Sequence, residues 1–254
     1  MDINETARAY EPPADALAGR NIMITGVTGG IGRALGLGAA ALGARVIGTG
    51  RNVKALSSFG DAVVQAGYPE PVLVPLNLAG AGVDDYAELA GRLGDAVGAL
   101  HGLVLNAGML GPMSAIRHYD PAEWARVMHV NVNSSFMLTR AMLPLLERAA
   151  EASIVFTSSS LGRRGRALWG AYAASKFAME GLMQVLADET RDTGIRVNSI
   201  NPGATATRMR AEAYPAEDPR TLPAPDDILA PFLYLLGPDS AGLRGEALNA
   251  QSPR

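Results

Sequence analysis

Short apolar segments recur along the chain, and most carry Val, Ile or Leu without the polar alternation of a half-exposed strand. Such runs are typical of strands that are buried on both faces of a sheet. The predicted strands are Ile22–Thr25, Arg45–Thr49, Val72–Leu76, Gly102–Asn106, Ser153–Thr157, Ile195–Ile200 and Ala247–Asn249.

Longer segments with helical character separate these runs, over residues 30–43, 52–66, 84–98, 122–148, 170–193 and 226–236. This alternation favours an α/β fold: a doubly wound parallel sheet of about seven strands with helices on both faces. No linker or repeat divides the pattern, so residues 19–254 are predicted to form one domain.

Two segments fall outside the alternation. Residues 1–18 are predicted to be a polar N-terminal arm, because Pro12-Pro13 stops any helix there. Residues 208–227 follow the sixth strand and are rich in Pro, Ala and charge. We predict a mobile lid over this span, with an ordinary surface loop as the alternative.

Composition narrows the classes of function. The chain has 254 residues, of which 48% are hydrophobic, enough for the core of one α/β domain. A net charge of -3, with 19% charged residues, argues against binding to nucleic acid or to a membrane surface. The absence of cysteine excludes disulfides, thiolate catalysis and zinc–thiolate sites.

Other absences are expectations of the same kind. His101, His118 and His129 are scattered without ligand spacing, so no metal site is expected. The first residues lack the cationic and apolar regions of a signal peptide. The chain has no uninterrupted run of roughly 18 apolar residues, so no membrane span is expected. We therefore expect a cytoplasmic protein.

A glycine-rich turn follows the first predicted strand and opens a helix. Its residues are Gly26, Thr28, Gly29, Gly30, Ile31 and Gly32. Glycines let the backbone approach a pyrophosphate, and the helix N-terminus offers unpaired N–H groups to it. The spacing is not the standard G-x-G-x-x-G, but strand before and helix after is the context that a dinucleotide turn requires.

The end of the second strand indicates which dinucleotide is bound. An acidic residue about 20 positions beyond the glycine turn would bind the ribose 2′-hydroxyl of NAD. This chain instead has Gly50 and then Arg51, and an arginine suits a 2′-phosphate. NADP(H) is therefore preferred over NAD(H), with a solvated arginine as the alternative.

Tyr172 and Lys176 stand four residues apart in a predicted helix and therefore share one face. An ammonium there lowers the pKa of a phenol, which can then exchange a proton with an alcohol or carbonyl oxygen. Ser159 lies just beyond a predicted strand, where its hydroxyl can bond an oxygen that gains charge. A helix surface and a strand-ending turn are the plainer readings of these residues.

With these motifs the chain, from about residue 19 to 250, resembles the classical short-chain dehydrogenase/reductases, nearest to a bacterial branch of uncharacterised oxidoreductases. The ordered matches are Thr25-Gly26-x-x-x-Gly30-x-Gly32, Asn106-Ala107-Gly108, Asn131, Ser159, Tyr172-x-x-x-Lys176, and Pro202-Gly203 followed by Thr207. The resemblance implies a single Rossmann-type, NAD(P)-binding domain.

The resemblance also implies roles. Tyr172 would be the acid/base, and Lys176 would lower its pKa and hold the nicotinamide ribose. Ser159 would orient the substrate oxygen, and Asn131 would anchor a water that links Lys176 to solvent. The implied cofactor-binding residues are Gly26, Thr28, Gly29, Gly30, Ile31, Gly32, Arg51, Asn77, Leu78, Asn106, Ala107, Gly108, Tyr172, Lys176, Pro202, Gly203, Thr205 and Thr207.

The chain departs from the family pattern at two places. Asn77 stands where relatives usually have an Asp against the adenine, and an amide can still bond a base edge. The usual Asp-Gly-Gly near the C-terminus is absent, and Gln251 follows the last predicted strand. Family-type contacts at the C-terminus are therefore in doubt.

Residues near the predicted site bear on the substrate. Basic side chains flank the mouth: Arg163, Arg164, Arg166, Arg208 and Arg210. They indicate either an anionic substrate or, by our preference, a solvated basic surface. Candidate walls of an apolar pocket are Met109, Leu110, Leu161 and Trp169, although core packing explains Leu161 equally well.

The predicted function is transfer of a hydride between NADP(H) and a small-molecule carbonyl or secondary alcohol. The alternative is a non-catalytic module that senses NADP(H) and regulates a partner. Since the helices over 122–148 and 170–193 carry surplus apolar positions, we also expect a homodimer or homotetramer. Examples of the surplus are Met137, Leu138, Leu145, Met179 and Met183.

Overall fold

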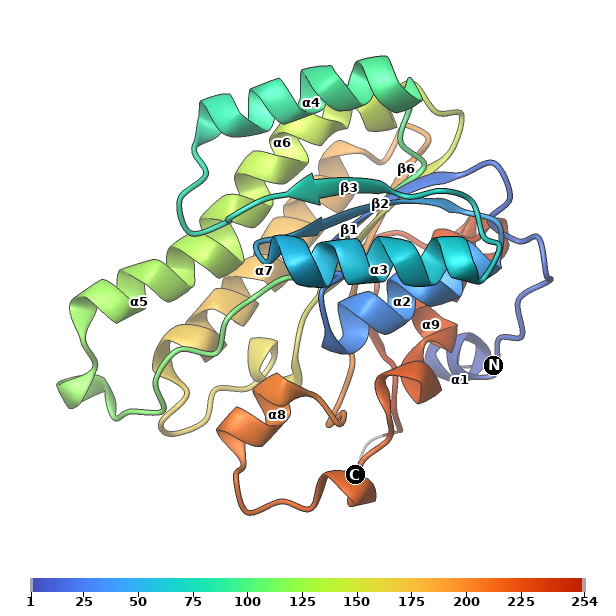
Figure 1. The fold of residues 1–254 in the computed structure, drawn as a ribbon. Coiled ribbons are helices and arrows are strands. Elements are labelled where there is room, and N and C mark those ends of the chain that lie inside the picture. Colours follow the sequence, from blue (N-terminus) through green and yellow to red (C-terminus); the bar gives the residue numbers. More distant parts are fainter. Residues whose placement is uncertain (1, 253–254) are drawn as a thin grey trace.

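The computed structural model describes residues 2–252, which contain one seven-stranded parallel sheet (Figure 1). The strands are β1 (Asn21–Thr25), β2 (Arg45–Gly50), β3 (Val72–Pro75), β4 (Gly102–Leu105), β5 (Ala152–Thr157), β6 (Ile195–Asn201) and β7 (Ala247–Asn249). Their order is β3-β2-β1-β4-β5-β6-β7. The order reverses between β1 and β4, and α/β sheets bind ligands beyond the carboxyl ends of strands at such a point.

Helices cover both faces of this sheet, as the alternating pattern predicted (Figure 1). One face carries α2 (Gly30–Ala41), α3 (Val53–Gln65) and α9 (Ala230–Leu236), and the other carries α4 (Val83–Val97), α6 (Ser134–Leu146) and α7 (Gly170–Glu189). Ile22 and Ile24 of β1 pack in the first layer, while Met23 packs in the second. Strands sandwiched in this way need apolar residues at successive positions, which explains the unbroken runs in the sequence.

The single helix predicted over residues 122–148 is wrong in detail. Helix α5 (Pro121–Met128) ends in a π-helical turn, His129–Asn133, and α6 begins at Ser134. A π turn places an extra residue in the helix and often marks a functional site. It leaves the apolar periodicity nearly unchanged, so the sequence pattern did not reveal it. Asn131, in the middle of the turn, is fully buried.

The N-terminal segment is packed against the domain, although the sequence predicted a polar arm without a helix. Helix α1 (Ile3–Arg8) starts at Asp2, whose carboxylate accepts from the Asn4 backbone N–H at 3.1 Å. Ala7 and Leu17 are fully buried. The Tyr10 ring packs against that of Tyr234 on α9 at 5.1 Å between centroids. Two buried apolar side chains in a polar segment do not make a hydrophobic pattern, so the sequence did not predict this packing.

The predicted lid contains short helices. Helix α8 (Arg208–Ala213) is followed by 3₁₀ turns at Pro219–Thr221 and Pro225–Ile228. The helix predicted over 226–236 accordingly begins as the second of these turns and continues as α9. Within residues 2–252, no helix is both long and apolar enough to cross a membrane.

Candidate active site

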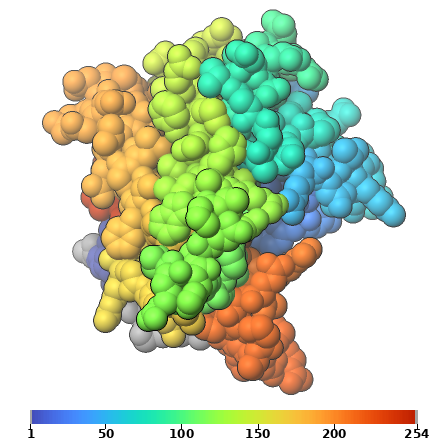
Figure 2. Space-filling view, turned by 90° about the vertical axis from the view of Figure 1, so that its left-hand side faces the viewer, coloured from blue at the N-terminus to red at the C-terminus, as the bar shows by residue number. Residues whose placement is uncertain are grey.

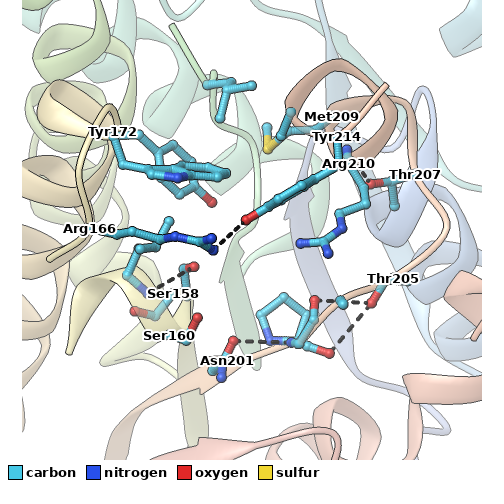
Figure 3. A pocket seen from close by; sticks show the side chains of 18 of the residues that line it. Ser158, Ser160, Arg166, Tyr172, Asn201, Thr205, Thr207, Met209, Arg210 and Tyr214 are labelled. Carbon is cyan, nitrogen blue, oxygen red and sulfur yellow. Dashed lines mark hydrogen bonds between the residues drawn. The ribbon is translucent and has the colours of Figure 1, made fainter. Parts of the chain in front are cut away.

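A cavity of about 630 Å³ opens beyond the carboxyl ends of β5 and β6 (Figure 3). Three segments far apart in the sequence form it: the turn after β5 with the start of α7, the loop after β6, and helix α8. Ile31, at the start of α2, also lines it. The structure therefore brings the glycine turn, Ser159, Tyr172 and the loop at Pro202 to one cavity.

Tyr172 lies in the first turn of α7, which begins beside the end of β5 and aims the phenol into the cavity (Figure 3). Ser159 follows β5 and lines the same cavity as Tyr172, and its hydroxyl favours the ionised form of the Tyr172 phenol, which lowers that pKa. Lys176 is one turn further along α7 and is nearly inaccessible. Its ammonium donates to the Thr157 carbonyl oxygen at 2.7 Å and lies 5.7 Å from the centre of the Tyr172 ring.

Burial shifts the two pKa values of this pair in opposite directions. It raises the pKa of Tyr172 to about 12, against a smaller lowering by the hydrogen bond with Ser159. Burial lowers the pKa of Lys176 to about 8, although the negative charge of Glu180 raises it. The pKa of Tyr172 is therefore raised, not lowered as the sequence led us to expect. Loss of hydration destabilises the phenolate, and Lys176 directs its ammonium at Thr157.

Asn131 ties three segments together through its side-chain amide. Its oxygen accepts from the Met109 backbone N–H at 2.8 Å, and its nitrogen donates to the Met109 carbonyl at 3.0 Å. The nitrogen also donates to Ser175 Oγ at 2.9 Å, and Ser175 donates in turn to the Tyr172 carbonyl at 2.7 Å. Both amide hydrogens are therefore used. A water bound to Asn131 would therefore have to donate a hydrogen bond to one of its oxygen atoms.

The glycine turn has the close backbone approach that a dinucleotide requires. Gly26 and Gly30 have φ of 80° and 50°, the left-handed region that favours glycine. A Cβ on Gly32 would lie 2.3 Å from the Gly26 carbonyl oxygen, so no larger residue fits there. The N-cap residue of helix α2 is Gly29, which has no side chain to cap it, so the first N–H groups of α2 have no side-chain acceptor. This cradle fits a pyrophosphate.

Thr25 links that turn to the Asn106-Ala107-Gly108 segment. Its hydroxyl oxygen accepts from the backbone N–H groups of Asn106 and Ala107, both at 2.9 Å. The Asn106 side chain donates to the Thr25 carbonyl at 3.0 Å. A Cβ on Gly108 would lie 3.2 Å from Asn131 Oδ1 and 3.9 Å from Lys176 Nζ. The segment therefore connects the glycine turn with the side chains around Lys176.

Arg51, Asn77 and Leu78 follow β2 and β3 and do not line the cavity. Arg51 and Asn77 are exposed, whereas Leu78 packs against the core. Asn77 Oδ1 accepts from the Ala79 backbone N–H at 3.3 Å, which leaves its amide nitrogen to an outside acceptor. A dinucleotide extended from the cavity past the glycine turn would reach this edge of the sheet.

The loop after β6 carries Pro202, Gly203, Thr205 and Thr207. Thr207 caps α8 by accepting from the Arg210 backbone N–H, and its methyl group would lie 3.4 Å from a Cβ on Gly30. Gln251, which the sequence left in doubt, holds the loop in place. Its Nε2 donates to the carbonyls of Pro202 and Ala204 at 2.8 and 2.9 Å. The C-terminal segment therefore contacts the loop after β6 through Gln251, although the usual Asp-Gly-Gly is absent.

The five arginines that the sequence analysis placed around the mouth of the site differ in their surroundings. Arg163 lies outside the cavity and is partly solvated: it pairs with Glu180 at 3.4 Å and donates to the Leu248 carbonyl at 3.0 Å. Arg208 is almost fully exposed and pairs with Glu212. Arg164, Arg166 and Arg210 line the cavity.

Three residues of α8 and its end, Met209, Ala213 and Tyr214, line the cavity and were missed. The ring of Tyr214 lies 5.8 Å from that of Trp169 between centroids. Of the predicted walls, Leu110, Leu161 and Trp169 line the cavity and Met109 does not. The signal for α8 was a threonine before helix-forming residues, and the nearby prolines concealed it.

The fold and cavity define a class: a dinucleotide-binding oxidoreductase with a tyrosine and a lysine on one helix. The sequence profile of short chain dehydrogenases matches residues 20–218, and the chain belongs to this family. The chain is 46% identical over 245 residues to Escherichia coli (strain K12) "Uncharacterized oxidoreductase YciK", a match that covers 96% of this chain and 97% of that protein.

Solved structures agree. The short chain dehydrogenase from Shigella flexneri matches with a TM-score of 0.95 and 45% identity, covering 98% of this chain and 97% of that chain. A protein from Escherichia coli CFT073, solved in complex with NADPH, matches with a TM-score of 0.93 and 46% identity, covering 95% of this chain and 100% of that chain. The chain is therefore an oxidoreductase of this family, and the predicted fold class is confirmed.

Proposed function

We propose that the protein uses NADP(H) to interconvert a small carbonyl compound and a secondary alcohol. The observation that carries this proposal is the cavity itself. Ser159, Tyr172, the loop at Pro202 and Ile31 all line it, so a substrate and a nicotinamide ring can lie together beside the reacting side chains. Within residues 2–252, no group of His, Cys, Asp or Glu is arranged to hold a metal ion.

In the reduction direction, bound NADPH would supply the hydride for the carbonyl carbon. Ser159 donates a hydrogen bond to the carbonyl oxygen and so orients it. Tyr172, which burial keeps protonated, transfers its proton to that oxygen as it gains charge. Lys176 provides a positive charge beside the resulting phenolate and bonds the ribose. Asn131 keeps this helix in register with the Met109 backbone.

The preference for NADP(H) rests on Arg51. It stands exposed at the carboxyl end of β2, where a 2′-phosphate would lie and where no carboxylate follows the strand. The E. coli CFT073 neighbour in complex with NADPH supports the same choice. Asn77, at the next strand end, would bond the adenine edge.

Replacement of Tyr172 by phenylalanine tests the mechanism, once a screen of carbonyl compounds by NADPH absorbance has supplied a substrate. Tyr172→Phe should lower turnover about 10²–10⁴-fold, the usual worth of a positioned proton transfer. NADPH affinity should stay within a few-fold, because the phenol is not placed at the phosphates. Tyr68→Phe, on a tyrosine that packs against the opposite core layer, is the matched control. A near-normal rate in Tyr172→Phe would refute the mechanism and favour an NADP(H)-sensing role.

A further inference from the structure

The charges around the cavity are unbalanced. Three arginines line it, whereas no Asp or Glu of the described residues does. Arg210 is neutralised, since Glu217 accepts from its Nε and Nη2 at 2.6 and 2.8 Å. Arg164 and Arg166 form no ion pair among the described residues. Every other arginine between residues 163 and 220 is paired with a carboxylate: Arg163, Arg191, Arg196, Arg208, Arg210 and Arg220.

Arg166 is also aimed into the cavity. Its Nη1 donates to the Tyr214 hydroxyl at 2.9 Å, so the two side chains meet across the cavity (Figure 3). A phenol is a weak, neutral acceptor for a guanidinium, and it leaves the other N–H groups of that planar fork available. The Arg210 guanidinium covers the Tyr214 ring at 3.8 Å and so fixes the ring on α8.

The chain that follows these arginines is held by a backbone contact and by ring packing. Leu168 has a φ of 74°, unusual for a residue with a side chain, and its carbonyl accepts from the Ser114 backbone N–H at 3.1 Å. The next residue, Trp169, is buried against Tyr172 and Tyr214, with ring centroids 5.7 and 5.8 Å away. Trp169 therefore forms an aromatic wall of the cavity beside both Tyr172 and Tyr214, the residue that Arg166 contacts.

A dinucleotide does not account for these two charges. Its pyrophosphate would lie at α2, which follows β1, and its 2′-phosphate near Arg51, which follows β2. The arginines follow β5, two and three strands away in the sheet order. At about 4.8 Å between neighbouring strands, these separations are about 10 and 14 Å. The unpaired charges belong to the part of the cavity left for the substrate.

We propose that the substrate is an anionic carbonyl or alcohol compound with an apolar body. Its carboxylate or similar anion binds Arg166 together with Arg164, and displaces the Tyr214 hydroxyl from Arg166. Its apolar body lies along Trp169 and Leu161, with the reacting oxygen at Ser159 and Tyr172. This inference rests on the proposed function for the identity of the reacting group, but not for the charge preference.

The charge preference is tested by binding alone. Calorimetry on the protein, with and without bound NADP⁺, would compare 4-(1-hydroxyethyl)benzoate, a secondary alcohol, with its methyl ester. The carboxylate should bind at least about tenfold more tightly, as a paired guanidinium–carboxylate contact does. Arg164→Gln combined with Arg166→Gln should remove that difference and leave the ester's affinity within about threefold. Arg208 is on α8 but outside the cavity, so Arg208→Gln should keep the difference in affinity between the carboxylate and its ester.

Equal binding of the two alcohols, or no detectable binding of the carboxylate, would overturn the inference. So would a preference that survives in the double variant. The turnover of 4-acetylbenzoate against its methyl ester, followed by NADPH absorbance, should show the same preference in kcat/KM. Failure of the proposed function has another signature: NADPH would not bind, or no carbonyl would be reduced, whatever the binding preference.

Discussion

Tyr172 and Lys176 share a helix face, the first partly buried and the second almost fully, so burial acts on both but penalises opposite states. The phenol loses hydration as phenolate, and its pKa rises to about 12. The amine loses hydration as ammonium, and its pKa falls to about 8. At neutral pH the tyrosine keeps its proton and most of the lysine is charged, which suits reduction of a carbonyl. The first of the two to titrate as pH rises is therefore Lys176.

The pH dependence of reduction should accordingly reflect Lys176. We expect kcat/KM to be constant at neutral pH and to fall as pH rises through about 8, where the ammonium loses its proton. Glu180→Gln removes the negative charge that raises this pKa, so the fall should move to lower pH. Asp188→Asn, at an exposed site further along α7, should leave the profile unchanged. A fall that moves to higher pH in Glu180→Gln would contradict this assignment.

Arg51 decides between the two cofactors if it bonds the 2′-phosphate. Arg51→Ala should weaken NADPH binding by about 1.5–3 kcal/mol, the scale of a hydrogen bond to a charged group, and change NADH binding little. Arg45→Ala, at the opposite end of the same strand, is the matched control. Both affinities can be measured from nicotinamide fluorescence. An equal loss for both cofactors, or no loss for either, would show that Arg51 does not contact the phosphate.

Among the elements, the loop after β6 depends most on a distant residue. Gln251 supplies two of its backbone carbonyls with donors and contacts Thr205 Oγ1 at 3.3 Å. Gly203 has a φ of 76°, and a Cβ there would lie 2.8 Å from the Gln251 side chain. The C-terminal residues therefore shape the loop after β6, although the strand before them, β7, has only three residues.

Gln251→Ala should loosen this loop without unfolding the domain, because water can reach the freed carbonyls. We expect NADPH to bind about 1–2 kcal/mol more weakly, the net worth of one or two neutral hydrogen bonds. Backbone amides of residues 203–206 should exchange hydrogen faster, as mass spectrometry can measure. Gln65→Ala, at the exposed end of α3, is the control. Unchanged exchange in the loop would show that other contacts hold it.

At the scale of the molecule, one face carries apolar side chains that the chain itself does not cover. Leu138, Leu145, Met179 and Met183, offered above as surplus positions, are instead buried in the core. The exposed side chains are Phe136 on α6, which is 50% exposed, and Phe177 and Val185 on α7, at 46% and 56%. Figure 2 shows this face, with the green surface of α5 and α6 between α7 and α4.

These side chains predict a homodimer or homotetramer, because exposed aromatic residues are typical of contacts between subunits. Light scattering at micromolar concentration should give a mass of two or four chains. Phe136→Asp combined with Phe177→Asp should lower it, since a carboxylate is costly to bury in an apolar contact. Val53→Asp on α3, at a site 62% exposed, should not. A monomeric wild type would refute the prediction.

The sequence by itself determined the sheet, its crossing helices and the family. Strands buried on both faces need unbroken apolar runs, and a dinucleotide turn needs glycines between a strand and a helix. Both requirements are local and can be read in the order of residues. The same local evidence placed Ser159, Tyr172 and Lys176 near one another, because the carboxyl ends of parallel strands share an edge of the sheet.

Tertiary structure decided what depends on contacts between distant segments. The π turn at Asn131 is stabilised by Met109 and Ser175 from other elements, and Gln251 meets Pro202 only after the chain has folded. The pKa values of Tyr172 and Lys176 follow from burial, which no spacing of residues specifies. The partners of charged side chains also depend on tertiary contacts: Arg163 pairs with Glu180, whereas Arg166, three residues later, lines the cavity. Local sequence fixes the backbone pattern, but the surroundings of each side chain are set by which elements pack against it.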